Sequence, residues 1–368
     1  MIWIDQQAPF DDAMARVAAQ KTVAIDTEAD SLHSYFDKVC LVQISIPGQD
    51  LIVDPLAKID LSALGTILAN HDIRKILHGA DYDLRILHRD FDFTVSNLVD
   101  TMICSQLLGY EAIGLAALLE RYFALTVDKS HQRADWAVRP LPRVMLEYAA
   151  SDTRHLIPLA EKLREELITL GRWEWAQEEF ARLENIRFSE KEDEGFRRLK
   201  GIGGFDRRSL GIARALYEWR DALARAADRP PFKIFGNDVI IDVAKNKAAD
   251  AEALEKIKAL PPTLRRRYGR EVLTRVRAAM ALPEEMLPEK ADARPWMRDK
   301  ALESRVSRLK TIRDKKAKEL KIDPGVLAPR HVLTALATTR DLGQVPAMRD
   351  WQRRILGDEL MAVLSPGC

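Results

Sequence analysis

The sequence predicts a mixed α/β domain in its amino-terminal half, followed by two all-helical modules. Short apolar runs joined by tight turns, then apolar runs alternating with helical patterns, predict a sheet with antiparallel and parallel parts. The carboxyl half is helical throughout and contains an internal repeat. A chain of 368 residues is long enough for two or three such domains.

The amino-acid composition is that of a globular protein. Hydrophobic residues make up 47% and charged residues 31% of the chain, as in ordinary globular proteins. The N-terminal segment has no basic region and no long apolar run, so we expect no signal peptide. No stretch of the chain has the uninterrupted apolar length of a membrane span, and we expect a cytoplasmic location. The three cysteines have no metal-ligand spacing and fit a reducing compartment.

Charge is distributed unevenly along the chain. Residues 1–195 hold 20 basic and 33 acidic side chains, a net charge of −13, whereas residues 196–368 hold 37 and 23, a net charge of +14. This opposition indicates an acidic site in the first half and a polyanion-binding face in the second. Solvated helix faces with a chance imbalance are the alternative.

The elements of the first half follow from periodicity and turn residues. In chain order we expect a lead-in strand, a helix over 9–19, strands over 22–25, 39–46 and 51–53, a helix over 61–70, a strand over 73–78, a helix over 81–89, a strand near 96–99, a helix over 101–108, a loop over 126–139, and helical structure over 143–185 interrupted near Pro158. The early strands should pair antiparallel and the later ones parallel.

Two carboxylates follow the strand over 22–25. Asp26 and Glu28 are two residues apart, and such residues of a strand point to the same face. Two like charges side by side are unfavourable unless a cation lies between them, so the pair indicates a site for a hard metal ion. Two loop carboxylates in water are the alternative reading of this motif alone.

Three further positions complete a candidate site. Asp83 lies in the first turn of a helix, where the helix dipole favours a negative charge. Tyr148 and Asp152 are four residues apart on one helix and share a face. Val144, one turn earlier on that face, indicates that the face points inward. Asp81 points in a different direction from Asp83 and is the alternative to it.

Oxygen ligands without histidine or cysteine suit Mg²⁺ or Mn²⁺. Asp26, at the centre of the set, can bridge two ions about 3.5–4 Å apart, as two-metal cleavage of a phosphodiester requires. The hydroxyl of Tyr148 can orient the attacking water.

The motifs together resemble a known family. The order DTE at 26–28, an aspartate in a helix start and Tyr-x-x-x-Asp resembles the tyrosine subclass of the DEDD superfamily of 3′→5′ exonucleases. The flanking segments resemble ribonuclease D, namely LVQIS, IVDPL, ILHGADYDL, DTMICSQLLG, TVDKSHQRADWAVRPL and YAASDTRHL. The resemblance covers residues 1–190 densely and implies a ribonuclease-H-like mixed sheet.

The resemblance also implies roles for individual residues. The metal-binding carboxylates would be Asp26, Glu28, Asp83 and Asp152, and Tyr148 would position the nucleophilic water. The Asp-Leu-x-x-Leu context favours Asp83 over Asp81. The residues implied in substrate binding are His78, Gln43, Lys129 and Arg139.

A repeat organises the carboxyl half. The pattern Arg-Asp-x-x-Ala, six residues, Pro occurs at 220–231 and again at 313–324, which predicts two copies of one helical module. Chance matching of so few positions is the alternative. The modules resemble the helicase-and-RNase-D C-terminal (HRDC) fold, and Trp219 should pack in the core of the first. The expected domains are an exonuclease domain over 1–195 and HRDC-like domains over 206–286 and 296–368.

The implied function is metal-dependent 3′→5′ exoribonuclease activity that releases nucleoside 5′-monophosphates, with two divalent ions as cofactors. The implied partners are single-stranded RNA 3′ ends, tRNA precursors in particular, bound by a monomer. Basic residues such as 265–267 and 315–316 would neutralise phosphates. A DNA 3′→5′ exonuclease and a non-catalytic RNA-binding protein are the alternatives. No polymerase-sized region accompanies the nuclease domain, which disfavours the DNA exonuclease. The intact set of acids disfavours the non-catalytic RNA-binding protein.

Overall fold

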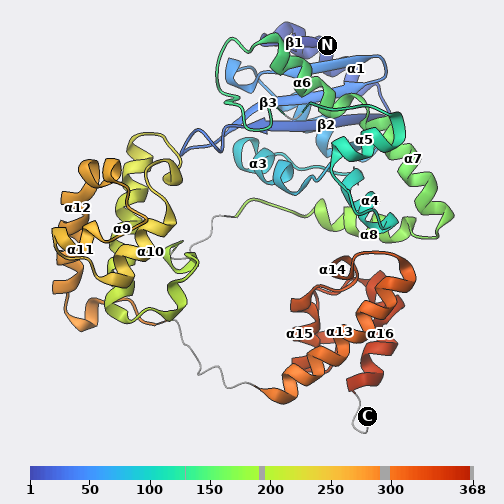
Figure 1. The fold of residues 1–368 in the computed structure, drawn as a ribbon. Coiled ribbons are helices and arrows are strands. Elements are labelled where there is room, and N and C mark those ends of the chain that lie inside the picture. The colour runs from blue at the N-terminus through green and yellow to red at the C-terminus, as the bar shows by residue number, and fades with distance from the viewer. Residues whose placement is uncertain (129, 190–194, 291–298, 365–368) are drawn as a thin grey trace. The chain divides into compact units, whose positions relative to one another are not determined.

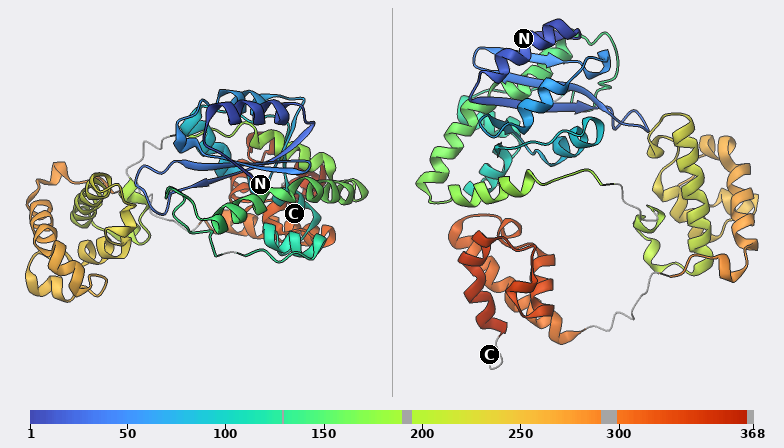
Figure 2. Two further views of the ribbon diagram at one scale, coloured as in Figure 1. Left: turned by 90° about the horizontal axis from the view of Figure 1, so that it is seen from above. Right: turned by 180° about the vertical axis from the view of Figure 1, so that it is seen from behind.

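The computed structural model describes residues 1–128, 130–189, 195–290 and 299–364. It consists of two compact units (Figures 1 and 2). The first unit contains residues 1–29, 38–188 and 298–368, and the second contains residues 30–37 and 189–297. This division differs from the predicted domains, because the carboxyl-terminal module belongs to the first unit and a loop of the α/β domain belongs to the second.

A six-stranded mixed sheet forms the centre of the first unit. Its strands are β1 (Ile2–Ile4), β2 (Thr22–Ala29), β3 (Val39–Ile46), β4 (Gln49–Val53), β5 (Arg74–Leu77) and β6 (Leu98–Asp100), in the order β1-β4-β3-β2-β5-β6. Strands β2, β3 and β4 pair antiparallel, while β5 and β6 continue the sheet parallel to β2. The predicted mixed sheet is confirmed, and β1 adds a parallel edge beside β4.

Helices cover both faces of the sheet, because β2 sends alternate side chains to opposite sides. Val23 and Ile25 pack with Phe10 of α1, and Ala24 packs with Leu159 and other residues of α7. The side of the sheet that carries Val23 and Ile25 is covered by α1 (Gln7–Ala18), α2 (Ser62–Ala69) and α3 (Asp81–Phe91). The short turn η1 (Pro55–Ala57) follows β4. The opposite side carries α4 (Thr101–Leu108), α5 (Leu115–Phe123), α6 (Arg143–Arg154), α7 (Leu156–Thr169) and α8 (Trp173–Leu183).

Two details differ from the predicted helices. Helix α5 occupies residues for which no element was predicted. The helical structure after residue 143 is broken at His155, and Pro158 lies in the first turn of α7, where the missing N–H breaks no helical hydrogen bond. Among the described residues, no helix combines the length and the apolar character needed to cross a membrane.

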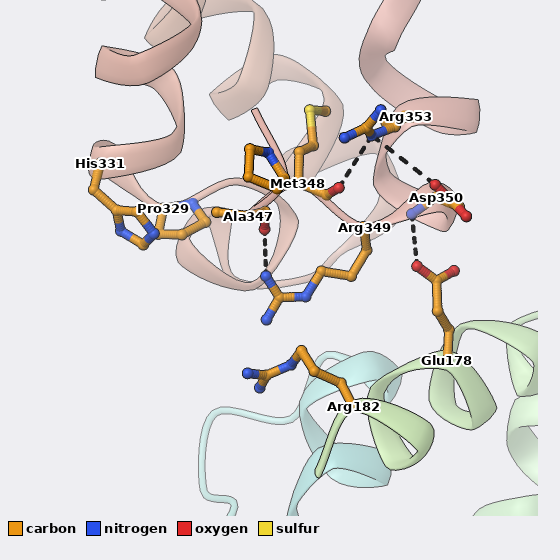
Figure 3. A pocket seen from close by; sticks show the side chains of 10 residues that line it. Glu178, Arg182, Pro329, His331, Ala347, Met348, Arg349, Asp350 and Arg353 are labelled. Atoms are coloured by element: carbon orange, nitrogen blue, oxygen red, sulfur yellow. Dashed lines mark hydrogen bonds and ion pairs between the residues drawn. The ribbon is translucent and has the colours of Figure 1, made fainter. Parts of the chain in front are cut away.

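The carboxyl-terminal module packs on α8. It contains α13 (Lys300–Leu320), α14 (Pro324–Leu327), α15 (Arg330–Thr339), η6 (Leu342–Gln344) and α16 (Asp350–Leu364). The carboxylate of Glu178 accepts hydrogen bonds from the backbone N–H groups of Asp350 at 2.6 Å and Trp351 at 2.9 Å, so it caps the start of α16 (Figure 3). A negative charge at this end of a helix also interacts favourably with its dipole.

Glu179, the next residue, is buried in the same contact. It accepts hydrogen bonds from Trp351 Nε1 and Arg349 Nε, each at 3.1 Å. The Trp351 ring stacks on Trp175 of α8, with centroids 4.9 Å apart and planes 10° apart. The module is therefore part of the core of the first unit.

The second unit is helical. Its helices are α9 (Arg207–Ala226), α10 (Asn237–Asn246), α11 (Ala251–Glu255) and α12 (Pro262–Ala281), with turns η2 (Gly195–Arg198), η3 (Ile202–Gly204), η4 (Pro231–Lys233) and η5 (Glu284–Met286). The loop that follows β2 is held in this unit. The hydroxyl of Tyr35 donates to Asp221 at 2.8 Å, and the N–H groups of Tyr35 and Phe36 donate to Asp228.

The sequence repeat corresponds to a repeated contact. Arg220 in α9 donates to the carbonyl of Phe235 at 3.1 Å, and Arg313 in α13 donates to the carbonyl of Ala328 at 2.8 Å. Both arginines are buried, and both acceptors lie fifteen residues further on. Trp219 packs against Phe235 in the core of its unit, as predicted.

The buried carboxylate of Glu179 allows a test of the packing of the carboxyl-terminal module. Replacing Glu179 with Ala leaves the Arg349 and Trp351 donors without their acceptor, and we expect the free energy of unfolding to fall by about 3 kcal/mol. Chemical denaturation measures the change. The control is Gln177→Ala on the exposed face of α8, and equal stability of the two variants would contradict the packing described here.

Candidate active site

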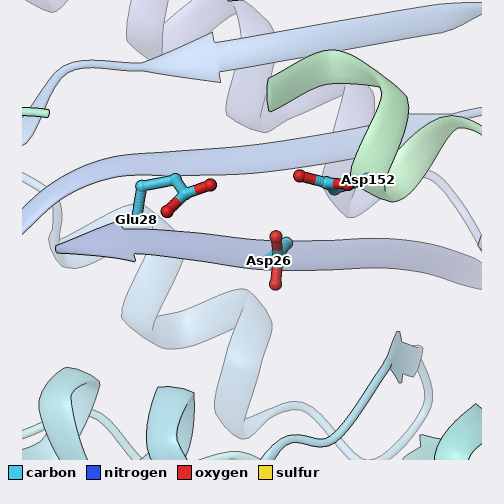
Figure 4. Close-up of side chains that lie close together, drawn as sticks. All are labelled: Asp26, Glu28 and Asp152. Carbon is cyan, nitrogen blue, oxygen red and sulfur yellow. The ribbon is translucent and has the colours of Figure 1, made fainter. Parts of the chain in front are cut away.

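The centre of the sheet carries a cluster of three carboxylates. Asp26 and Glu28 project from β2, and Asp152 projects from α6 (Figure 4). Each residue has a carboxylate oxygen within 4.8 Å of those of the other two. The two-residue period of the strand places Asp26 and Glu28 together, and the packing of α6 on β2 and β3 brings Asp152 to them.

The fourth predicted carboxylate is Asp83 in the first turn of α3. It is 7% exposed and accepts a hydrogen bond from the hydroxyl of Thr27. Its negative charge helps to raise the pKa of Asp26. Asp81 is exposed and pairs with Arg85 Nε at 2.7 Å. Asp83 is not one of the three acids whose oxygens lie within 4.8 Å of one another, but its burial and its effect on Asp26 distinguish it from Asp81.

Burial and mutual repulsion disfavour the simultaneous ionisation of these carboxylates when no cation is bound. Burial, followed by repulsion from Asp83, Asp152 and Glu28, raises the pKa of Asp26 well above its ordinary value. Burial and the charges of Asp152 and Asp83 raise the pKa of Glu28 to about 9. Burial raises the pKa of Asp152 to about 7 and that of Asp83 to about 6. The cluster thus binds protons strongly when no other cation is near.

A hard divalent cation fits this donor set. The convergent ligands are carboxylate oxygens, which Mg²⁺ and Mn²⁺ prefer, and a bound cation relieves the repulsion that raises these pKa values. Asp26, Glu28 and Asp152 would hold such an ion, with Asp83 beside them.

Tyr148 lies one turn before Asp152 on α6. Its ring contacts His131 and Trp136, at centroid distances of 5.8 and 6.0 Å. Burial and the nearby carboxylates raise the pKa of its hydroxyl, so the group keeps its proton. Val144 is 62% exposed, and the inward orientation inferred from it is wrong at that turn. The side chain lines a pocket of about 500 Å³ that reaches Tyr148.

The four residues predicted to bind substrate have different environments in the structure. The side chain of Gln43 is fully buried and cannot contact RNA directly in this conformation. Arg139 uses every nitrogen of its guanidinium within the chain, on Asp54 and on three backbone carbonyl groups, and we do not retain it as a phosphate ligand. Lys129 lies outside the described residues.

His78 is held in one tautomer. Thr101 Oγ1 donates to the carbonyl of Leu77, so it accepts from Nδ1–H of His78 at 2.9 Å. The other ring nitrogen, Nε2, is then a buried acceptor that finds no partner among the described residues. Burial lowers the pKa of the imidazole, which keeps it neutral.

Sequence reasoning missed three residues that shape the site. Thr27 binds Asp83, and Gln132 makes a hydrogen bond with Tyr148. Asp100 accepts from the N–H groups of Gly79 and Ala80 at 3.0 and 2.8 Å, fixing the segment between β5 and α3. Only Asp100 has a sequence signal, because an aspartate between a strand and a helix is a typical N-cap.

Comparison with known proteins gives two matches to family models. Residues 1–168 match the 3′-5′ exonuclease model, and residues 209–276 match the HRDC domain model. The first range contains all five residues discussed above as acids or water-positioning groups. The second range lies within the second unit and overlaps the first predicted helical module.

The similarity to named relatives covers most of the chain. The ribonuclease D of Acidiphilium cryptum is 29% identical over 94% of this chain and 88% of its own. The structure of Escherichia coli RNase D, described as an exoribonuclease involved in structured RNA processing, matches with a TM-score of 0.76 and 25% identity over 99% of this chain and 98% of that one. A Bifidobacterium adolescentis protein structure matches with a TM-score of 0.83 and 27% identity over 99% and 97%.

The raised pKa of Glu28 predicts how stability depends on pH. The folded chain retains the Glu28 proton up to about pH 9, whereas an ordinary glutamate loses it near 4.5. Stability without metal should therefore fall as the pH rises through this window. Glu28→Gln removes this carboxylate and should stabilise the fold in EDTA at pH 9 by about 1.5 kcal/mol, which in a domain of this size raises the melting temperature by roughly 3–6 °C. At pH 4 the substitution should have little effect.

The control for this measurement is Asp81→Asn, which removes an exposed acid outside the cluster. Thermal unfolding at both pH values compares the two variants. A Glu28→Gln variant that is no more stable than wild type at pH 9 would show that the Glu28 carboxylate is not strained by its neighbours.

Proposed function

We propose that this chain, a ribonuclease D homologue and a 3′–5′ exoribonuclease, hydrolyses RNA with two divalent metal ions in the maturation of tRNA 3′ ends. The observation that carries the metal-dependent mechanism is the convergence of Asp26, Glu28 and Asp152 within 4.8 Å. The proposed location is the cytoplasm.

The acids of the site would hold the ions. Asp26 has a carboxylate oxygen within 4.8 Å of those of Glu28 and Asp152, and the charge of Asp83 also acts on it, which supports Asp26 as the residue that would serve two ions. Mg²⁺ or Mn²⁺ bound there would supply the charge that activates water and stabilises the leaving oxygen. Glu28 and Asp152 must lose their protons to act as ligands, because metal-bound carboxylates are ionised.

Tyr148 would orient the attacking water. Its hydroxyl keeps its proton at any working pH, so it acts through hydrogen bonds and is not a general base. Contacts with Trp136 and Gln132 hold the ring in place. The water molecule then needs no titratable side chain other than the acids that bind the ions.

Positive charge in the helical half supports a nucleic acid as the substrate. Arg266, Arg267 and Arg270 are exposed on α12 of the second unit, where they can bind phosphates. The proposed tRNA substrate rests on the resemblance to ribonuclease D, and the Escherichia coli relative is described as acting in structured RNA processing.

A substrate comparison tests this proposal. We expect a tRNA with a 3′ extension to be shortened one nucleotide at a time from its 3′ end in Mg²⁺ or Mn²⁺, and to remain intact in EDTA. A DNA of the same sequence should be shortened more slowly. Faster shortening of the DNA would favour a DNA exonuclease, and binding without cleavage would contradict catalysis.

The acids can be tested one at a time. Asp26→Asn and Asp83→Asn should each lower the rate of RNA shortening by at least about 1,000-fold, because each weakens the binding of ions that activate water. RNA affinity, measured by fluorescence anisotropy, should change little. The matched control Asp81→Asn should keep the wild-type rate, and loss of activity in that variant with retention in Asp83→Asn would reverse the assignment.

A further inference from the structure

Gln43 lies directly beside the central carboxylate of the site. It is on β3, and its backbone partner across the antiparallel ladder with β2 is Asp26. Directly opposed residues on antiparallel strands project to the same face, with Cβ atoms about 4.5–5.5 Å apart. The amide of Gln43 and the carboxylate of Asp26 are therefore neighbours on one face of the sheet.

Two other residues of β3 show which face this is. Leu41, two residues before Gln43, packs in the same cluster as Tyr148 of α6. Ser45, two residues after it, has its hydroxyl 2.7 Å from that of Thr153, also on α6. Since residues two apart on a strand share a face, Gln43 lies on the face of β3 that packs against α6, the helix that carries Asp152.

The amide has no partner in this position. The side chain of Gln43 has no exposed surface, and neither Oε1 nor Nε2 makes a hydrogen bond with any described residue. Burying an unsatisfied amide destabilises the fold, and an apolar side chain of similar size avoids that cost. The full burial also excludes direct contact with RNA in this conformation, and the ladder pairing makes Asp26 the neighbouring acid of the site.

We propose that Gln43 is a positioning residue of the metal site, whose Nε2–H group donates a hydrogen bond to the carboxylate of Asp26 when divalent ions bind. The inference rests on the proposed metal-dependent function. Ionised Asp26 is a strong acceptor, and a donor on its inner side fixes the direction in which its oxygens point. The amide, which makes no hydrogen bond with a described residue, thus gains a partner when the ions bind.

The test separates stability from metal binding. Gln43→Met keeps the volume and removes both polar atoms, so we expect its melting temperature in EDTA to equal or exceed that of wild type. Its dissociation constant for Mn²⁺, measured by isothermal titration calorimetry, should rise about 10-fold, as is typical when a group that orients a metal ligand is lost. Gln43→Leu is a second variant with the same expected result.

Ser45→Ala is the matched control. It removes a buried polar group from the same face of β3, but Ser45 has partners in Thr153 and Asp50. We expect Ser45→Ala to lower the melting temperature in EDTA and to leave the Mn²⁺ dissociation constant within about 2-fold of wild type.

The possible outcomes are distinct. If wild type and Gln43→Met bind Mn²⁺ equally well, the inference is overturned and the proposed function stands. If Gln43→Met resembles Ser45→Ala, with lower stability and unchanged affinity, Gln43 is a structural residue and the inference is likewise overturned. If wild type binds no Mn²⁺, the metal-dependent function fails first and the inference fails with it.

Discussion

Repulsion between close carboxylates is the interaction on which this structure depends. Asp26, Glu28 and Asp152 lie so near one another that, without a cation, the raised pKa values keep protons on the cluster at neutral pH. A fold maintains such an arrangement only if the surrounding elements resist the separation of the charges. Here the acids are fixed by the central strand β2 and by α6, both of which are packed into the core.

The same requirement for rigid support explains features away from the site. Arg139 joins Asp54 to three backbone carbonyl groups and thereby secures the segment that leads into α6. Asp100 fixes the segment that leads into α3 and Asp83. On α8, Glu178 and Glu179 hold the carboxyl-terminal module in the first unit. These charged groups are used for structure, although their residue types alone would equally suit binding roles.

Much of the site follows from short-range periodicity. The two-residue period of a strand aligns Asp26 with Glu28, and the four-residue spacing on a helix aligns Tyr148 with Asp152. The repeat in the carboxyl half also shows in the sequence, because Arg220 and Arg313 make the same contact at the same spacing. The mixed sheet was predictable for a similar reason, since turn lengths and helix alternation set strand direction.

Contacts between distant segments could not be predicted in this way. The partner of Arg139 is 85 residues away, and that of Glu179 is 172 residues away, so neither leaves a periodic signal. Attachment of the last helical module to the first unit depends on such pairs. The Asp-Leu-x-x-Leu context already favoured Asp83 over Asp81, and what the structure adds is the burial of Asp83 beside Thr27.

Anomalous diffraction from crystals soaked in Mn²⁺ would locate the ions at the carboxylate cluster. We predict strong anomalous density within coordination distance of the carboxylates of Asp26, Glu28 and Asp152, with Asp26 contacting every ion present. Mn²⁺ density elsewhere on a chain that needs Mn²⁺ to shorten RNA, with none at these three acids, would contradict it.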